Sequence, residues 1–315
     1  MKEIDHFCYN LPLLEYWGLL QTIASNREGE MREKIESKWE GRETKGIAFV
    51  LTGSDGKRER HPQSSTEMIV LLDESFDRRS NLEGLEDDWF LGEVKEVGKE
   101  VLSFYKGDVR FVYPDRILGG LFLFGDEGLW LKVRKNVVKE MVAEGELGRK
   151  IRDQIKEQTR VYRRTLETGI YRGLEVFDSG RQFYFESKDW KNNRMGFKMG
   201  PIRAVQRRMD WWVVQLIRNQ KLEVEEVVKS FPSNTVERIR FFEDKKFMNN
   251  NMARSLTEAY LWFLREYHKV QEVFKNSAKD KVVEVGFNFA EFAFQKQRVF
   301  DFLNYSQELV SGFCR

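Results

Sequence analysis

The chain has 315 residues, about the length of two domains, and its 53 Lys and Arg nearly balance its 51 Asp and Glu, leaving a formal net charge of +2. That balance argues against a strongly basic nucleic-acid-binding protein. The two cysteines, Cys8 and Cys314, are too few for a disulfide framework or a cysteine-rich zinc site, which favours a reduced, cytoplasmic compartment. An aromatic fraction of 14% excludes a disordered chain.

The amino-terminal twenty residues do not resemble a signal peptide. Acidic residues precede a short apolar stretch, and no small-residue cleavage site follows. No segment approaches about 18 uninterrupted apolar residues, so the sequence predicts no transmembrane helix and no membrane partner. We expect a cytoplasmic protein, and secretion by a route that reads no such peptide is compatible with the same sequence.

The first predicted elements are two helices and two strands. Residues 13–23 have helical spacing, and Asn26 is suited to cap a second, charged helix that runs to about Trp39. Residues 46–52 (GIAFVLT) form an almost continuous apolar run, which is typical of a strand buried on both faces. A glycine-bearing turn and a polar stretch lead to a second strand, 68–72.

A helix over residues 88–105 is predicted by apolar side chains that recur every three or four positions, and a third strand is predicted over 109–113. From Leu129 onward the pattern is mostly helical, with apolar stripes in three segments: 202–216, 256–274 and 289–303. The fold class expected is therefore α+β, with a small mixed sheet followed by a mostly α-helical domain. The boundary is expected between residues 115 and 145.

The segment with the clearest chemical content is 53–71, GSDGKRERHPQSSTEMIVL. Gly53 and Gly56 lack side chains, so backbone amides there could approach a phosphate closely. Ser54 offers a hydroxyl, and Lys57 belongs to a local basic cluster. Glu67 begins the second strand and would place a carboxylate at the mouth of the turn. Simple turn chemistry between two strands explains the same glycines equally well.

This segment resembles the signature of the DNA-polymerase-β-type nucleotidyltransferase superfamily, in the branch of PII uridylyltransferases, glutamine synthetase adenylyltransferases and related signal-transduction nucleotidyltransferases. That signature reads approximately GSxGRxE, five residues, then DxD. Its turn falls on Gly53, Ser54 and Gly56, its basic position on Lys57 and its glutamate on Glu59. The DxD positions fall on Ser65 and Glu67.

Two later segments extend the resemblance in the family's order. GFKMGPIRAVQ keeps Lys198, Gly200 and Arg203 of a family segment, and FGDEGLW (124–130) resembles the opening of the post-catalytic helix. The resemblance implies a nucleotidyltransferase-like domain over 1–130 and a helical domain over 131–315. It also implies a nucleoside triphosphate as substrate and Mg²⁺ or Mn²⁺ as cofactor.

The roles implied by the resemblance are specific. Glu67 and Asp108 would be the metal-binding and catalytic carboxylates. The nucleotide would be held by a larger set: Gly53, Ser54, Gly56, Lys57, Lys198 and Arg203. The acceptor would be a protein or a small molecule, because the balanced charge argues against nucleic acid.

The chain departs from the family at the first metal position, where neutral Ser65 replaces an aspartate, and at Gly196, which replaces the aspartate before the family's lysine. Either another acid, such as Asp55 or Asp73, supplies the missing carboxylate, or the fold is a catalytically inactive module that binds nucleotides or protein partners through its helical domain. A helical scaffold with an incidental turn is a third interpretation.

Other basic and aromatic residues have simpler interpretations. The arginines of the helical half are suited either to a triphosphate or to a solvated helix face: Arg163, Arg164, Arg172, Arg207 and Arg208. Trp211 and Trp212 lie in an apolar stripe, which predicts core packing rather than a base-stacking platform.

Overall fold

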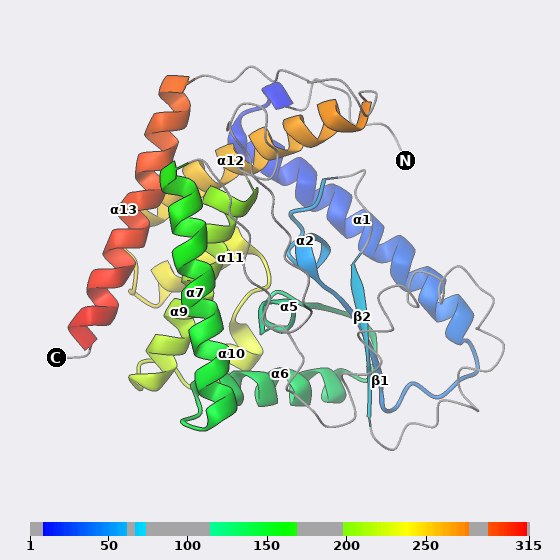
Figure 1. The fold of residues 1–315 in the computed structure, drawn as a ribbon. Helices are drawn as coiled ribbons and strands as arrows, with labels where there is room; N and C mark the ends of the chain where they lie inside the picture. The colour runs from blue at the N-terminus through cyan, green and yellow to red at the C-terminus, as the bar shows by residue number, and fades with distance from the viewer. Residues whose placement is uncertain (1–8, 62–66, 74–113, 169–197, 277–288, 314–315) are drawn as a thin grey trace, which may run out of the picture. The chain divides into compact units, whose positions relative to one another are not determined.

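The computed structural model describes residues 9–61, 67–73, 114–168, 198–276 and 289–313 (Figure 1). The chain divides into two compact units, neither of which is one continuous stretch. The sheet unit comprises Leu19–Arg149 and Leu222–Thr235. The helical unit comprises Met1–Gly18, Lys150–Lys221 and Val236–Arg315. The described residues are mostly helical with one small sheet, which confirms the α+β class.

The sheet has three strands in the order β2-β1-β3, namely β2 (Met68–Leu72), β1 (Ile47–Leu51) and β3 (Leu121–Gly125). The two strands predicted over 46–52 and 68–72 are confirmed. The described strands pair antiparallel, so the expectation of a mixed sheet is not met within this part of the chain. β3 was not predicted. The helix predicted over 88–105 and the strand predicted over 109–113 lie outside the described residues.

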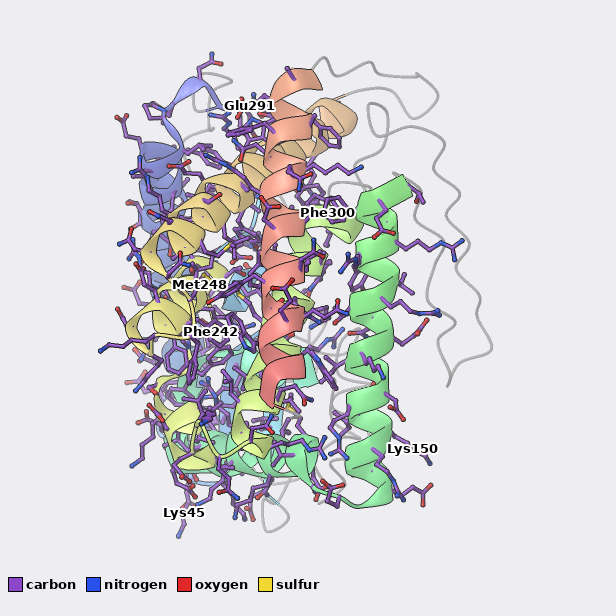
Figure 2. All side chains as sticks on the ribbon, turned by 90° about the vertical axis from the view of Figure 1, so that its left-hand side faces the viewer. Lys45, Lys150, Phe242, Met248, Glu291 and Phe300 are labelled. Atoms are coloured by element: carbon purple, nitrogen blue, oxygen red, sulfur yellow. The ribbon has the colours of Figure 1, made fainter. Side chains whose placement is uncertain are left out.

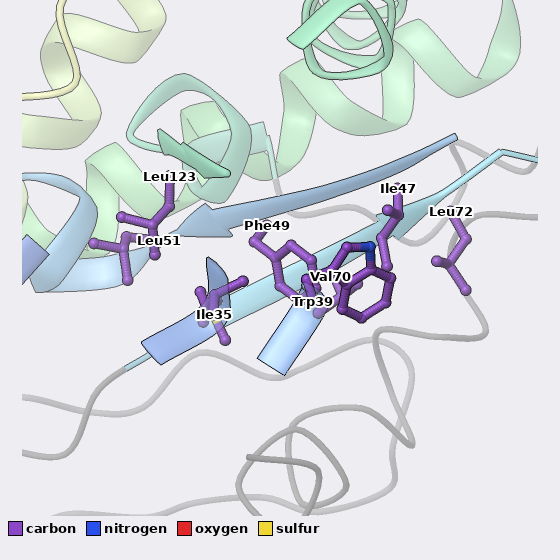
Figure 3. Packing of buried hydrophobic residues seen from close by; sticks show 9 residues of the cluster. Ile35, Trp39, Ile47, Phe49, Leu51, Val70, Leu72 and Leu123 are labelled. Carbon is purple, nitrogen blue, oxygen red and sulfur yellow. The ribbon is translucent and has the colours of Figure 1, made fainter. Parts of the chain in front are cut away.

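All five residues of β1 are buried, as its uninterrupted apolar sequence predicts. On one face, Ile35 and Trp39 of helix α1 (Leu13–Trp39) meet side chains from the strands, with the Trp39 and Phe49 rings 5.4 Å apart (Figure 3). Helix α6 (Glu127–Val142) contacts β1 and β3, and α5 (Pro114–Leu118) contacts α6. The side chains of Trp130 and Val50 both lie beside Gly120, where a Cβ atom would be 2.9 Å from each. β1 therefore lies between two hydrophobic layers.

Helix α1 is a single helix, which corrects the prediction of two helices separated near Asn26. The intervening sequence, NREGEMREK, consists mainly of strong helix formers, so the helix propagates through it and needs no new cap. Its amino-terminal residues belong to the helical unit and the rest to the sheet unit.

The helical unit is built from long amphipathic helices. Its described elements, in chain order, are α7 (Glu146–Thr168, which begins in the sheet unit), the short π-helical turn η3 (Lys198–Ile202), α9 (Arg203–Arg218), α11 (Thr235–Asp244), α12 (Asn250–Asn276) and α13 (Phe289–Phe313). The three predicted apolar stripes fall on α9, α12 and α13. Trp212 is fully buried and stacks on Phe242 at 4.5 Å, so its predicted core role is confirmed, whereas Trp211 is half-buried. Figure 2 shows Phe242 together with Met248 of the same unit.

Several arginines of this unit are structural rather than solvated. Arg207 and Arg238 both pair with Asp210, at 2.9 and 2.8 Å, and all three side chains are buried. Arg208 donates to the Ser306 hydroxyl, and burial together with nearby Arg163 lowers its pKa to about 10. Buried guanidinium groups of this kind are retained only when they have partners.

Other predicted basic residues lie at the surface or beyond the described ranges. Arg163 pairs with Glu167 at 3.1 Å, and Arg164 is exposed. Arg172 lies outside the described residues. Among the described helices, none is both long enough and apolar enough to cross a membrane.

We predict that Gly125→Ala destabilises the sheet unit. Gly125 has φ +103°, and a Cβ atom there would lie 2.2 Å from the Ile47 carbonyl oxygen, so the backbone between β3 and β1 must shift. The expected loss is about 2–3 kcal/mol in the free energy of unfolding, measured by urea denaturation. Gly29→Ala is the matched control, because its Cβ meets open space within α1 and should stabilise by up to about 1 kcal/mol. Equal changes in the free energy of unfolding for the two substitutions would contradict the predicted need for glycine at position 125.

Candidate functional site

The candidate site is the turn that follows β1 in the sheet unit. Gly53–Gly56 forms one helical turn, α2, and Gly53 enters it with φ +62°, in the left-handed region that favours glycine. The Thr52 amide donates to the Glu67 carbonyl at 2.9 Å, so the beginning of the turn is bonded to the residue that precedes β2.

Gly53 and Glu67 are in direct contact. A Cβ atom at Gly53 would lie 1.9 Å from Glu67 Oε2, and therefore the glutamate carboxylate occupies the space beside the glycine. Glu67 is exposed and Ser54 is half-buried. The structure thus brings two of the predicted site residues, Gly53 and Glu67, into contact at the start of the turn, and Ser54 follows Gly53 within it.

Gly56 and Lys57 have different surroundings. The Gly56 amide donates to the Thr52 carbonyl at 3.1 Å, and a Cβ there would lie 2.4 Å from the Gly119 carbonyl oxygen. Gly56 therefore permits close packing, and its amide is already used inside the turn. Lys57 is only 3% exposed. Neither the Gly56 amide nor the Lys57 ammonium is therefore the exposed donor for a phosphate that the prediction requires.

Arg58 and Arg60, the two arginines of the basic cluster that begins at Lys57, both form ion pairs with carboxylates. Arg58 makes a bidentate pair with Glu28 of α1, at 2.7 and 2.6 Å. Arg60 pairs with Asp55 at 2.8 Å, and both of these side chains are nearly inaccessible to solvent. The positive charge that the sequence shows between residues 57 and 60 is largely neutralised within the protein.

Asp55 also accepts a hydrogen bond from the Glu67 amide, at 3.1 Å, so both of its oxygens are engaged. Burial raises the pKa of Asp55, and Arg60 and the Glu67 amide oppose that shift. The alternative acid Asp73 follows the other end of β2, roughly 20 Å from Glu67 at about 3.3 Å per strand residue, and pairs with Lys132. Neither carboxylate is free to replace the one missing at Ser65.

Glu59 is buried and accepts the Thr235 amide at 2.8 Å, at the first residue of α11. A carboxylate at a helix amino terminus is favoured by the helix dipole. Nearby, Asn234 donates to the Lys57 carbonyl at 2.8 Å. These two bonds add to the packing of α10 (Val224–Ser230) against α6 in attaching the segment 222–235 to the sheet unit. Sequence reasoning missed Asn234, and no motif marks it.

Asp126, within FGDEGLW, is the N-cap of α6. Its carboxylate accepts the Leu129 amide at 2.9 Å and the Gly46 amide at 3.0 Å. These two bonds lower the pKa of Asp126. The segment thus opens a helix, as the resemblance implies, while also fixing the entry to β1.

The second predicted group of residues belongs to the helical unit. Lys198 and Gly200 lie in η3, which contains Pro201, and the Lys198 ammonium lies 6.0 Å from the centre of the Tyr267 ring. Arg203 is half-buried and donates to Gln206 at 3.1 Å. Their predicted role toward a nucleotide stays a prediction.

Of the two predicted metal ligands, only Glu67 lies within the described residues. Within the described ranges, no group of three or more His, Cys, Asp or Glu side chains is placed to hold a metal ion. Mg²⁺ is commonly held by one or two carboxylates together with phosphate oxygens and water. Glu67 supplies one exposed carboxylate, whereas Asp108 and Ser65 lie outside the described residues.

No protein-family model matches the chain, and no curated protein sequence matches it.

We predict that the cap at Asp126 makes a pH-dependent contribution to stability. Because its pKa is lowered in the folded protein, the contribution is present above the ordinary value of 3.8 and is lost as the pH falls through the folded value. Asp126→Ala should reduce the free energy of unfolding by about 1–2 kcal/mol at pH 7 and by less at pH 3. Glu127→Ala, at the exposed next position, should cost less than about 0.5 kcal/mol. If Asp126→Ala lowers the free energy of unfolding by the same amount at both pH values, the ionised Asp126 carboxylate does not stabilise the helix as predicted.

Proposed function

We propose that the sheet unit binds a nucleoside triphosphate with Mg²⁺ at the mouth of the Gly53–Gly56 turn and transfers a nucleotidyl group to a protein or small-molecule acceptor. The observation that supports this proposal is the exposed Glu67 carboxylate lying against the Cα of Gly53. A carboxylate beside a glycine turn is suited to a metal-bridged phosphate, since only glycine leaves room for both.

The remaining groups of the proposed site are assigned on different grounds. Ser54 is half-buried and follows Gly53 in the turn, and its hydroxyl is assigned to a phosphate oxygen by the resemblance. Asp108 is assigned as the second carboxylate by the resemblance alone, as are Lys198 and Arg203 as phosphate ligands. Mg²⁺ would neutralise phosphate charge, and Glu67 would hold it at the turn.

The reaction implied by the resemblance is attack of an acceptor oxygen on the α-phosphate, with pyrophosphate as the leaving group. Ser65 cannot supply the carboxylate that the family places there, and Asp55 is already engaged by Arg60 and the Glu67 amide. Loss of one such carboxylate costs several kcal/mol of transition-state stabilisation, on the order of a thousandfold in rate. We therefore expect slow transfer.

Glu67→Gln tests the proposed metal ligand. Calorimetry with each nucleoside triphosphate should show that Mg²⁺ strengthens binding to the wild type, and that the substitution removes at least about tenfold of that gain while leaving metal-free binding unchanged. Glu43→Gln is the matched control, because Glu43 is another exposed glutamate of the same unit. Wild-type protein that binds no triphosphate in a metal-dependent way would rule out the proposal.

A second candidate function, a catalytically inactive nucleotide-binding or protein-interaction module, is favoured by neutral Ser65 and by the engagement of both Asp55 oxygens.

Pyrophosphate release distinguishes the two functions. For an enzyme we expect slow release by the wild type, loss of release in Glu67→Gln, and faster release in Ser65→Asp, which restores the family's acid. Metal-dependent binding without release by either the wild type or Ser65→Asp would establish the module instead.

A further inference from the structure

Glu67 is held through its backbone on both sides. Its amide donates to Asp55 Oδ2 at 3.1 Å, and its carbonyl accepts the Thr52 amide at 2.9 Å. The second bond extends the antiparallel pairing of β1 with β2, whose last pair is Leu51 with Met68. The first bond is different in kind, because it comes from a side chain in the turn itself.

The Asp55 carboxylate is fixed in turn by Arg60, which donates to its other oxygen at 2.8 Å. Both side chains are about 5–6% exposed, so the carboxylate cannot exchange its partners for water at low cost. One buried carboxylate therefore joins the turn at residue 60 to the beginning of β2 at residue 67.

The geometry points to Asp55 as a positioning residue that sets the place of the Glu67 carboxylate at the mouth of the turn. This inference rests on the proposed function, since it names how the proposed metal ligand is held. The Asp55 side chain is about 5% exposed, and it is joined to the proposed metal ligand by the hydrogen bond from the Glu67 amide.

Asp55→Asn separates the two hydrogen bonds with little change in volume. The asparagine has one acceptor oxygen, and the charged Arg60 guanidinium competes for it most strongly. The amide nitrogen of the asparagine then faces the Glu67 N–H, so two donors oppose each other and the Glu67 bond is broken. Arg58→Met is the matched control, because it removes the neighbouring Arg58–Glu28 ion pair and leaves both hydrogen bonds of Asp55 in place.

The first measurement is amide hydrogen exchange in the full chain without nucleotide. We expect Asp55→Asn to speed exchange of the Glu67 amide by about tenfold relative to the β2 amides, and Arg58→Met to leave that ratio near the wild-type value. Unchanged Glu67 protection in Asp55→Asn overturns the inference whether or not the protein binds nucleotide. If Asp55→Asn does not fold, the double substitution Asp55→Ala with Arg60→Ala, which leaves no unpaired buried charge, decides the question in the same assay.

The second measurement is the Mg²⁺-dependent gain in affinity for a nucleoside triphosphate. Asp55→Asn should reduce this gain about tenfold, and the double substitution with Glu67→Gln should reduce it no further than Glu67→Gln alone, because Asp55 acts through Glu67. Additive losses overturn the inference. Absence of any metal-dependent gain in the wild type removes the proposed function, and the exchange result alone then decides whether Asp55 holds Glu67.

Discussion

Burial of β1 on both faces is the constraint on which the sheet unit depends. Because β1 is buried on both faces, the polar turn that follows it begins in the protein interior. The buried charged side chains of that turn therefore need partners within the protein. Asp55 with Arg60 and Glu59 with the Thr235 amide meet this requirement. Removing one partner of a buried ion pair typically costs about 3–5 kcal/mol, so these contacts are needed for the fold itself.

The same requirement limits what the turn has left for a ligand. Most of its charged side chains are committed to the protein, and Glu67 is the exposed carboxylate that remains at the mouth. The segment 53–67 can therefore be divided by burial. Its buried members hold the turn and the adjoining segments together, and its accessible members are the ones available to chemistry.

The sequence predicted those strands and helices in which apolar residues form a continuous run or recur at helical spacing. β1 and β2 follow from their apolar runs, and α9, α12 and α13 follow from stripes at helical spacing. The division of α1 at Asn26 was wrong because a cap-forming residue does not end a helix whose neighbours all favour it. β3 was missed because LFLFG is short and adjoins a helix start.

The candidate site was predictable only in part. The meeting of Glu67 with Gly53 follows from a carboxylate at the beginning of one strand and a glycine at the end of the other. The bonds of Asn234 to the Lys57 carbonyl and of Asp55 to the Glu67 amide leave no periodic pattern, because each joins a side chain to a backbone group. One consequence concerns dissection of the chain: a fragment that stops at Arg149 would lack residues 222–235 and leave the Glu59 carboxylate without its amide partner. The sheet unit is thus not separable by a single cut, and its smallest self-sufficient form must carry the α10 segment.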